Sequence, residues 1–227
     1  FLVTYEDGDS EEIVDPYSYQ FYTAFTEEEV KKFGAGIYYD SYQKFGAHPT
    51  VEAGISGVHF AVWAPDAMRV SVVGDFNFWD GRRHQMKKRG PSGIYEIFIP
   101  GLKPGTIYKY EIKTKAGDPM LKADPYANFS ELRPNTASVI WDMTDYQWND
   151  GEWIEKRKAA KDRLKDSPMS IYEVHLGSWM QKPVAQDENG DDINGSQFYN
   201  YREIAEKLAA YVKEMGYTHV ELLPVME

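Results

Sequence analysis

The feature that most constrains the fold is a series of short alternating segments between residues 46 and 141. Each segment places apolar side chains at every second position, and Gly or Pro residues separate it from the next. This period predicts half-buried strands, and their close spacing is typical of a small antiparallel β-sandwich. The strands are predicted at residues 57–63, 69–73, 93–100, 106–112 and 138–141.

The pattern changes after the predicted sandwich. Residues 152–165 carry six basic side chains and few apolar ones, which predicts a surface linker helix. Residues 170–176 are then predicted as a strand, 201–215 as an amphipathic helix and 217–223 as a buried strand. Gly216 stands where a helix end favours positive φ. This order predicts a right-handed βαβ unit with parallel strands.

Composition excludes several functional classes. The 227 residues include no cysteine, which removes disulfides, thiolate metal sites and cysteine nucleophiles and fits a reducing compartment. No apolar run approaches the roughly 20 residues that span a bilayer, and the N-terminus lacks the basic start of a signal peptide. The net charge of -11 argues against nucleic acid as a partner. We therefore expect a cytoplasmic protein that binds neither nucleic acid nor membrane.

Charge is unevenly distributed along the chain. Residues 1–33 hold nine acids and two lysines, whereas residues 82–115 hold nine basic residues and two acids. The basic stretch could meet phosphate or an acidic neighbour, but alternation along strands more often leaves such charges on a solvated face. We expect the solvated face.

A weak repeat relates the N-terminus to the sandwich. Tyr5-Glu6 precedes Asp15-Pro16-Tyr17 by ten residues, and Tyr110-Glu111 precedes Asp124-Pro125-Tyr126 by fourteen. Each copy has the pattern of a strand, a charged turn and an Asp-Pro-Tyr exit. The repeat predicts that residues 1–20 are the tail of an earlier sandwich module.

Several motifs occur in an order that is typical of one family. They are Phe45-Gly46-Ala47-His48-Pro49, Val58-His59-Phe60-Ala61-Val62-Trp63-Ala64-Pro65, Gly74-Asp75-Phe76-Asn77-Phe78-Trp79-Asp80-Gly81, Lys122-Ala123-Asp124-Pro125-Tyr126, Leu132-Arg133-Pro134-Asn135-Thr136-Ala137-Ser138, Ile171-Tyr172-Glu173-Val174-His175-Leu176-Gly177-Ser178-Trp179 and Tyr217-Thr218-His219-Val220-Glu221-Leu222-Leu223-Pro224. In these blocks the chain resembles the N-terminal portion of a 1,4-α-glucan (glycogen) branching enzyme of the α-amylase superfamily. Debranching enzymes share the plan of sandwich and barrel but match the blocks less closely.

The resemblance implies a fold class and domain boundaries. It implies a mainly β sandwich, an immunoglobulin-like glycogen-binding module, followed by the first βαβ unit of an incomplete (β/α)8 TIM barrel. The implied domains are a module tail at 1–20, a linker at 21–45, the sandwich at 46–145, a linker helix at 146–169 and the start of the barrel at 170–227. Because the chain begins without Met, we expect a truncated piece of a longer protein. The missing barrel segment or another chain would then cover the last domain.

The resemblance also implies an activity. Family enzymes cleave α-1,4-glucan by a retaining double displacement, with an Asp nucleophile, a Glu acid/base and a second Asp, and form an α-1,6 branch by transfer to a 6-hydroxyl. Those acids follow the fourth, fifth and seventh barrel strands, and only two strands are predicted here. The resemblance therefore assigns no catalytic residue, metal or cofactor to this chain. It predicts an inactive fragment whose partner is α-glucan, in the form of glycogen, amylose or maltooligosaccharide.

Asn77, Trp79 and Lys109 are the candidate carbohydrate-binding residues. Sugar rings offer apolar faces edged by hydroxyls, so their sites combine an aromatic platform with amide and charged groups. Trp79 and Lys109 also match glucan-contacting positions of related glycogen-binding modules, such as that of the AMP-activated kinase β subunit. The second platform tryptophan of those modules is replaced near Asp118-Pro119-Met120, which predicts weak or relocated binding. The alternative is a module that mainly braces the barrel.

Other candidates lie around the predicted barrel. Trp179 follows the first strand at the edge where barrel enzymes bind substrates, so it either stacks on a sugar or packs against the next loop. Glu173 and His175 share a strand face, and we expect a pair satisfied among barrel side chains rather than one in the substrate cleft. The acidic loop 181–197 lacks the EF-hand order, which favours a solvated loop over a calcium site. Packing in the core or between domains is expected for Trp63, Trp141, Trp148 and Trp153.

Two functions from different classes fit these observations. The first is part of a branching enzyme, with a related debranching-type enzyme as a variant. The second is a stand-alone, non-catalytic glycogen-binding or scaffold protein. Residues 170–227 separate the two, because a self-sufficient binding module does not need helix and strand faces that require further partners.

Overall fold

The computed structural model divides into two compact units, Phe1–Gln147 and Trp148–Glu227. It describes residues 1–12, 15–19, 23–144, 146–161, 166–183, 188–190 and 197–225. The loop at 181–197, considered above as a calcium site, lies mostly outside these residues. Within the described ranges, no helix is long and apolar enough to cross a membrane, and no cluster of acidic, His or Cys side chains is arranged to hold a metal ion.

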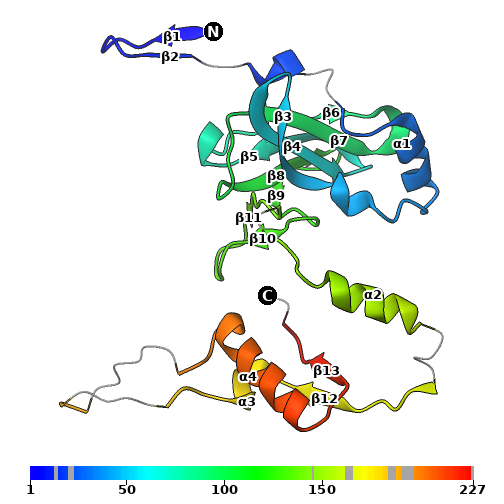
Figure 1. Cartoon of the computed structure of the whole chain (residues 1–227). Helices are drawn as coiled ribbons and strands as arrows, with labels where there is room; N and C mark the ends of the chain where they lie inside the picture. The colour runs from blue at the N-terminus through cyan, green and yellow to red at the C-terminus, as the bar shows by residue number, and fades with distance from the viewer. Residues whose placement is uncertain are drawn as a thin grey trace. The chain divides into compact units, whose positions relative to one another are not determined.

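A β-sandwich forms most of the first unit, as the alternating segments predict (Figure 1). Its strands are β3 (Gly46–Glu52), β4 (Ile55–Trp63), β5 (Ala67–Val73), β6 (Lys87–Lys88), β7 (Ile94–Pro100), β8 (Ile107–Thr114), β9 (Met120–Lys122), β10 (Phe129–Ser130) and β11 (Ser138–Val139). One sheet, here called the β4 sheet, has the order β3-β4-β7-β6. The other, the β8 sheet, has the order β10-β11-β8-β5, with β9 also paired to β8. All of these pairs are antiparallel.

The main core lies between the two sheets. Phe60 of β4 and Tyr108 and Tyr110 of β8 are all 0% exposed and belong to this core. The hydroxyls of the two tyrosines donate to Asp124 Oδ2 at 2.6 and 3.0 Å. Burial raises the pKa of Asp124, and these donors provide the partners that a buried carboxyl group requires. The Asp-Pro-Tyr exit is thereby fixed to the centre of the sandwich.

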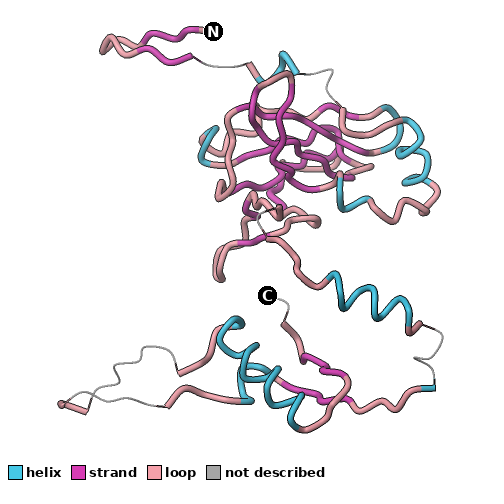
Figure 2. Tube along the Cα trace, viewed as in Figure 1, coloured by secondary structure: helices cyan, strands magenta, loops and turns pink. Residues whose placement is uncertain are grey.

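The two Asp-Pro-Tyr segments form the same local turn. Tyr126 N donates to Asp124 Oδ1 at 2.8 Å, and Tyr17 N donates to Asp15 Oδ1 at 2.8 Å. Each turn follows an antiparallel hairpin, which is β8 with β9 in the sandwich and β1 (Leu2–Thr4) with β2 (Ser10–Glu12) at the N-terminus. Figure 2 shows the N-terminal hairpin beside the N label. The weak sequence repeat therefore corresponds to a repeated local structure.

Residues 23–45, here called the N-terminal cover, pack on the outer face of the β4 sheet. They include helix α1 (Glu27–Gly34). Phe25 and Phe45 are 2% and 0% exposed and form a second, smaller core with Ala61 and Ile94 of the sheet. The described part of the predicted linker 21–45 is thus packed on the sandwich through Phe25 and Phe45, while Tyr39 and Tyr42 stay exposed. The domain boundary itself stays a prediction.

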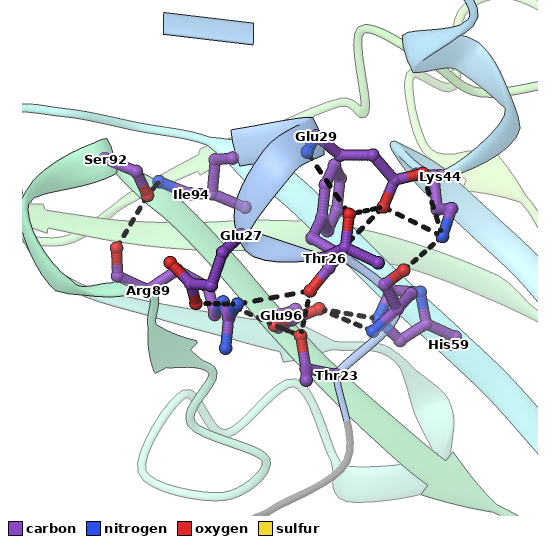
Figure 3. A network of polar contacts seen from close by, with 12 residues as sticks. Thr23, Thr26, Glu27, Glu29, Lys44, His59, Arg89, Ser92, Ile94 and Glu96 are labelled. Carbon is purple, nitrogen blue, oxygen red and sulfur yellow. Dashed lines mark hydrogen bonds and ion pairs between the residues drawn. The ribbon is translucent and has the colours of Figure 1, made fainter. Parts of the chain in front are cut away.

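A buried polar network fastens the N-terminal cover to the sheet (Figure 3). Glu96 of β7, with a side chain 1% exposed, accepts hydrogen bonds from Thr23 Oγ1 and from Ala24 N, and it lies 3.3 Å from both His59 Nε2 and Arg89 Nε. Burial opposes its ionisation, but hydrogen bonds from His59, Thr23 and Ala24 outweigh it and hold the pKa of Glu96 below its ordinary value. Burial also lowers the pKa of His59. A neutral imidazole therefore donates to an ionised carboxylate at this position.

Helix α1 begins inside the same network. Thr26 and Glu29 form a capping box at its N-terminus. Partial burial opposes the ionisation of Glu29, but hydrogen bonds from Thr26, Tyr38 and Lys44 lower its pKa to about 2.

The uneven charge of the chain shows at Arg89, which also pairs with Glu27 at 2.9 Å. The acidic N-terminal stretch and the basic stretch therefore meet at one arginine, while most other basic side chains of residues 82–115 are exposed, as expected.

The second unit contains the predicted βαβ unit. Its elements are α2 (Gly151–Ala159), β12 (Ile171–Val174), α3 (Leu176–Trp179), α4 (Tyr201–Glu214) and β13 (His219–Leu222). Strands β12 and β13 pair in parallel, and α4 lies between them in sequence. Asn200 and Glu203 form a capping box at the start of α4, and Gly216 follows its end with φ 77°. The amphipathic helix and its glycine stop are confirmed, and α2 covers the first part of the predicted linker helix, of which residues 162–165 lie outside the described residues.

Part of the second unit presents apolar side chains to solvent. A groove of about 280 Å³ is lined by residues of α3, α4 and β13 and of the chain after β13: Leu176, Tyr201, Ile204, Ala205, Leu208, Leu222 and Val225. Ile171 and Leu222, one on each strand, are 50% and 46% exposed. A strand pair of this kind has apolar surface left to cover.

Candidate carbohydrate-binding site

The β5–β6 loop, residues 74–86, leaves β5 close to the backbone of β8. A Cβ atom on Gly74 would stand 2.4 Å from Ile107 O, so only glycine allows this approach. Ser71 Oγ donates to Gly81 O at 2.7 Å and fastens the loop to β5. The loop carries two of the three predicted carbohydrate-binding residues.

Asn77 is buried and organises the loop from inside. Its Oδ1 accepts from Gly74 N at 3.0 Å, and its Nδ2 donates to Val72 O and to His84 Nδ1, each at 2.9 Å. Burial, assisted by the charge of Arg83, lowers the pKa of His84 and keeps Nδ1 available as an acceptor. Asn77 is 0% exposed, so it has no amide group to offer a sugar. The structure therefore corrects the predicted role of Asn77 from ligand contact to loop positioning.

Trp79 is held in a fixed orientation and still reaches the surface. Its backbone has φ 59°, and its backbone N–H donates to Gly74 O at 2.9 Å. The indole Nε1 donates to Asp75 Oδ1 at 2.7 Å, while the side chain remains partly exposed. A ring with its N–H group satisfied and part of its surface open is suited to act as a platform for an apolar sugar face.

Lys109 lies on the outer face of the β8 sheet. It is in register with Val73, the residue immediately before the loop that carries Trp79. Its Nζ donates to Oγ1 of the exposed Thr136 at 2.8 Å. The register thus brings Lys109 beside the start of the Trp79 loop. Sequence reasoning missed Thr136, because its contact joins positions 27 residues apart without a local pattern.

Met120 lies near the predicted position of the second platform tryptophan. Met120 lies in β9, 42% exposed and in register with Ile112. A thioether chain is flexible and has no flat face for a sugar ring. The arrangement at the β8 sheet therefore rests on Trp79 and Lys109.

Trp179 packs within the second unit. Its indole Nε1 donates to Tyr172 Oη at 2.8 Å, and its ring meets Tyr211 edge-on at 5.7 Å. These partners lie in β12 and α4 rather than in the loop that follows, so stacking on a sugar and packing against that loop both stay predictions. Glu173 is exposed and in register with Glu221 of β13, while Nδ1 of His175 lies 3.1 Å from Ser178 Oγ.

The other four tryptophans are 44% to 78% exposed: Trp63, Trp141, Trp148 and Trp153. The expectation that they lie in a core is therefore wrong within each unit, and packing between domains stays a prediction. Trp63 Nε1 donates to Ser92 O at 3.2 Å, and Trp141 stacks on Phe129 at 4.8 Å.

The sandwich matches a described carbohydrate-binding family. Residues 44–127 match Carbohydrate-binding module 48 (Isoamylase N-terminal domain). The chain is 53% identical over 207 residues to the 1,4-alpha-glucan branching enzyme GlgB of Synechococcus sp. (strain JA-3-3Ab), covering 86% of this chain and 26% of that protein. It is 50% identical over 226 residues to GlgB of Rubrobacter xylanophilus, covering 99% of this chain and 29% of that protein. The chain thus spans between a quarter and a third of the length of these relatives.

Solved structures share the fold at lower identity. A pullulanase type I from Bacillus subtilis str. 168, complexed with maltose, superposes with a TM-score of 0.52 at 25% identity, covering 86% of this chain and 25% of that chain. PulA from Klebsiella pneumoniae, in a ligand-free structure, gives a TM-score of 0.54 at 24% identity, covering 81% and 18%. These likenesses agree with the sandwich-like fold.

The motif order, the family match and the identity to the relatives agree with one another. The chain is similar in sequence to the 1,4-alpha-glucan branching enzymes over a quarter to a third of their length, and its residues 44–127 match the carbohydrate-binding module 48 family.

Proposed function

We propose that this chain is the N-terminal part of a 1,4-α-glucan branching enzyme and that its sandwich binds α-glucan. The observation that carries the binding proposal is the placement of an anchored, partly exposed Trp79 indole and of Lys109 at the same end of β5 and β8. The indole supplies an apolar platform for one glucose face. The Lys109 ammonium and the Thr136 hydroxyl supply hydrogen-bonding groups for the hydroxyls at the sugar's edge.

The activity proposed for the whole protein rests on its relatives. Curated proteins named 1,4-alpha-glucan branching enzyme are 45% to 54% identical to this chain, whereas the two pullulanases are 24% to 25% identical. This difference favours branching over a debranching-type activity. The proposed reaction is cleavage of an α-1,4-glucan by a retaining double displacement, with transfer to a 6-hydroxyl. We expect the 227-residue chain alone to be inactive in this reaction.

The second unit supports an enzyme rather than a stand-alone scaffold. A parallel strand pair connected through a helix has the topology with which a (β/α)8 barrel begins. The groove formed by α3, α4 and β13 exposes apolar side chains that a self-sufficient binding module has no use for. Further barrel strands and helices, or another chain, would bury them.

The β1–β2 hairpin and its Asp15 turn support the proposal that residues 1–20 end an earlier sandwich module.

Calorimetric titration with maltoheptaose tests the binding proposal. We expect the wild-type chain to bind, Trp79→Ala to weaken the affinity about tenfold, or roughly 1.4 kcal/mol, and Lys109→Ala to weaken it less. Tyr39→Ala is a matched control, because Tyr39 is 83% exposed and lies in the N-terminal cover. Equal affinity of wild type and Trp79→Ala, or no binding by either, would sink the proposal.

A further inference from the structure

Phe78 is a large apolar residue that the site described above does not use. Its side chain is 81% exposed, and it directly precedes Trp79 in the β5–β6 loop. A single exposed aromatic residue is ordinary on a protein surface. Its position next to an anchored, partly exposed indole is not ordinary, because one loop then brings two aromatic side chains to the surface.

The backbone holds both residues in a conformation that bulky side chains avoid. Phe78 and Trp79 each have φ 59°, in the left-handed region. Hydrogen bonds from Phe78 N to Asp75 O and from Trp79 N to Gly74 O enforce this turn, and the buried Asn77 amide supports it. Left-handed backbone at non-glycine residues persists where the surrounding structure imposes it, and it concentrates at binding and catalytic sites.

Arg83 lies over one side of the Phe78 ring. Its Cζ lies over the ring, 5.6 Å from the centroid, in a cation–π arrangement. With one face of the ring occupied by Arg83, the large exposed fraction of Phe78 leaves the other face to solvent. The guanidinium also brings N–H donors to the rim of the ring, where sugar hydroxyls would lie.

We propose that Phe78 is a second stacking residue of the glucan site, with Arg83 holding its ring and donating to sugar hydroxyls. The inference rests on the proposed function, because it places a second glucose unit next to the one on Trp79. Phe78 and Trp79 are consecutive residues with left-handed helical φ angles. In a helical turn, consecutive side chains point about 100° apart. The two rings therefore form an angled surface, which suits the curved α-1,4-glucan chain and not the flat ribbon of a β-1,4-glucan.

Titrations of the full 227-residue chain with maltoheptaose and cellohexaose test this inference. We expect Phe78→Ala and Phe78→Leu each to weaken maltoheptaose binding about threefold to tenfold, since both remove the flat face, and Phe78→Tyr to stay within about twofold. We expect Tyr39→Ala to match wild type and cellohexaose not to bind. Thermal melting of each variant checks folding, and Phe78→Leu retains the bulk should Phe78→Ala be less stable.

The outcomes separate this inference from the proposed function. If Trp79→Ala loses affinity while Phe78→Ala and Phe78→Leu bind like wild type, the role of Phe78 is overturned and the glucan site stands. If Phe78→Leu binds as well as wild type and Phe78→Ala does not, the contact is apolar bulk rather than stacking. Cellohexaose bound as tightly as maltoheptaose overturns the angled surface. A wild-type chain that binds neither sugar removes the proposed function and this inference with it.

Discussion

The two sheets of the sandwich differ in what lies on their outer faces. On the β4 sheet the N-terminal cover buries Glu96 and His59, and aromatic side chains close a second core around them. On the β8 sheet the outer face holds Lys109 beside the loop that presents Phe78 and Trp79 to solvent. The polar groups on the outer face of the β4 sheet make contacts inside the protein, whereas those on the outer face of the β8 sheet stay at the surface. We infer that glucan binds on the β8 sheet, whereas the contacts on the outer face of the β4 sheet stabilise the fold.

The largest expected effect is a loss of core packing under the N-terminal cover. Phe45 is fully buried, with its ring 4.9 Å from Phe25 and 5.1 Å from Tyr126. Phe45→Ala should lower the free energy of unfolding by about 3 to 5 kcal/mol in urea titrations, through lost burial and the cavity left behind. Phe78→Ala, the same change on the exposed loop, should stay within about 0.5 kcal/mol. Equal losses in the two variants would contradict the distinction between the faces.

Removing the buried carboxylate should have the next largest effect. Glu96→Ala leaves Arg89 and His59 without their shared partner inside the protein, which should cost about 3 kcal/mol of unfolding free energy. Glu111 pairs with Arg69 on the β8 sheet, where the two side chains are 16% and 25% exposed. Glu111→Ala should therefore cost less than Glu96→Ala, about 1 to 2 kcal/mol, because the Arg69 guanidinium keeps some contact with water. Maltoheptaose affinity should be unchanged in Glu96→Ala, and a loss of affinity there would show that the covered face takes part in binding.

The strands and the long helix were predictable because their signals are local. Val58, Phe60 and Val62 alternate along one strand, and Tyr201 begins a helix with a polar cap before it and Gly216 after it. The N-terminal cover was not predictable in this way. Thr23 and Glu96 lie 73 positions apart in the sequence, and no local sequence pattern around either residue predicts their hydrogen bond.

The candidate site was predicted in part for the same reason. Trp79 and Lys109 were found by residue type and by resemblance, and the sheet register then placed them together. Asn77 has the right chemistry for a sugar contact, but residue type does not tell whether an amide faces a ligand or its own loop. Phe78 gave no signal, because an aromatic residue between Asn77 and Trp79 is expected in a core until its exposure is known.

A smaller loss is expected where the loop itself is weakened. Asn77→Ala leaves Gly74 N and Val72 O without their side-chain partner, which should cost about 2 kcal/mol of unfolding free energy. It should also weaken maltoheptaose binding, because Trp79 would lose its fixed position. Trp79→Ala should weaken binding with little effect on the urea midpoint. If Asn77→Ala bound maltoheptaose like wild type, the role of Asn77 as a positioning residue would be wrong.

The smallest effect separates the two faces by pH. The pKa of His59 is lowered by burial, so between that folded value and the ordinary value near 6.5 the unfolded chain binds a proton that the folded chain does not. The stabilisation is therefore fully present above pH 6.5 and is lost as the pH falls toward the folded pKa, at up to about 1.4 kcal/mol per pH unit. Urea titrations from pH 7.5 to 5.5 should show this slope in wild type and a smaller one in His59→Gln.

The pH dependence of binding involves a different histidine. Burial lowers the pKa of His84 too, so acid also destabilises the fold there, and a proton on Nδ1 would remove the acceptor that Asn77 uses. Acid should then weaken maltoheptaose binding through His84 and leave that loss in place in His59→Gln. A loss of affinity that disappears in His59→Gln would instead tie binding to the covered face.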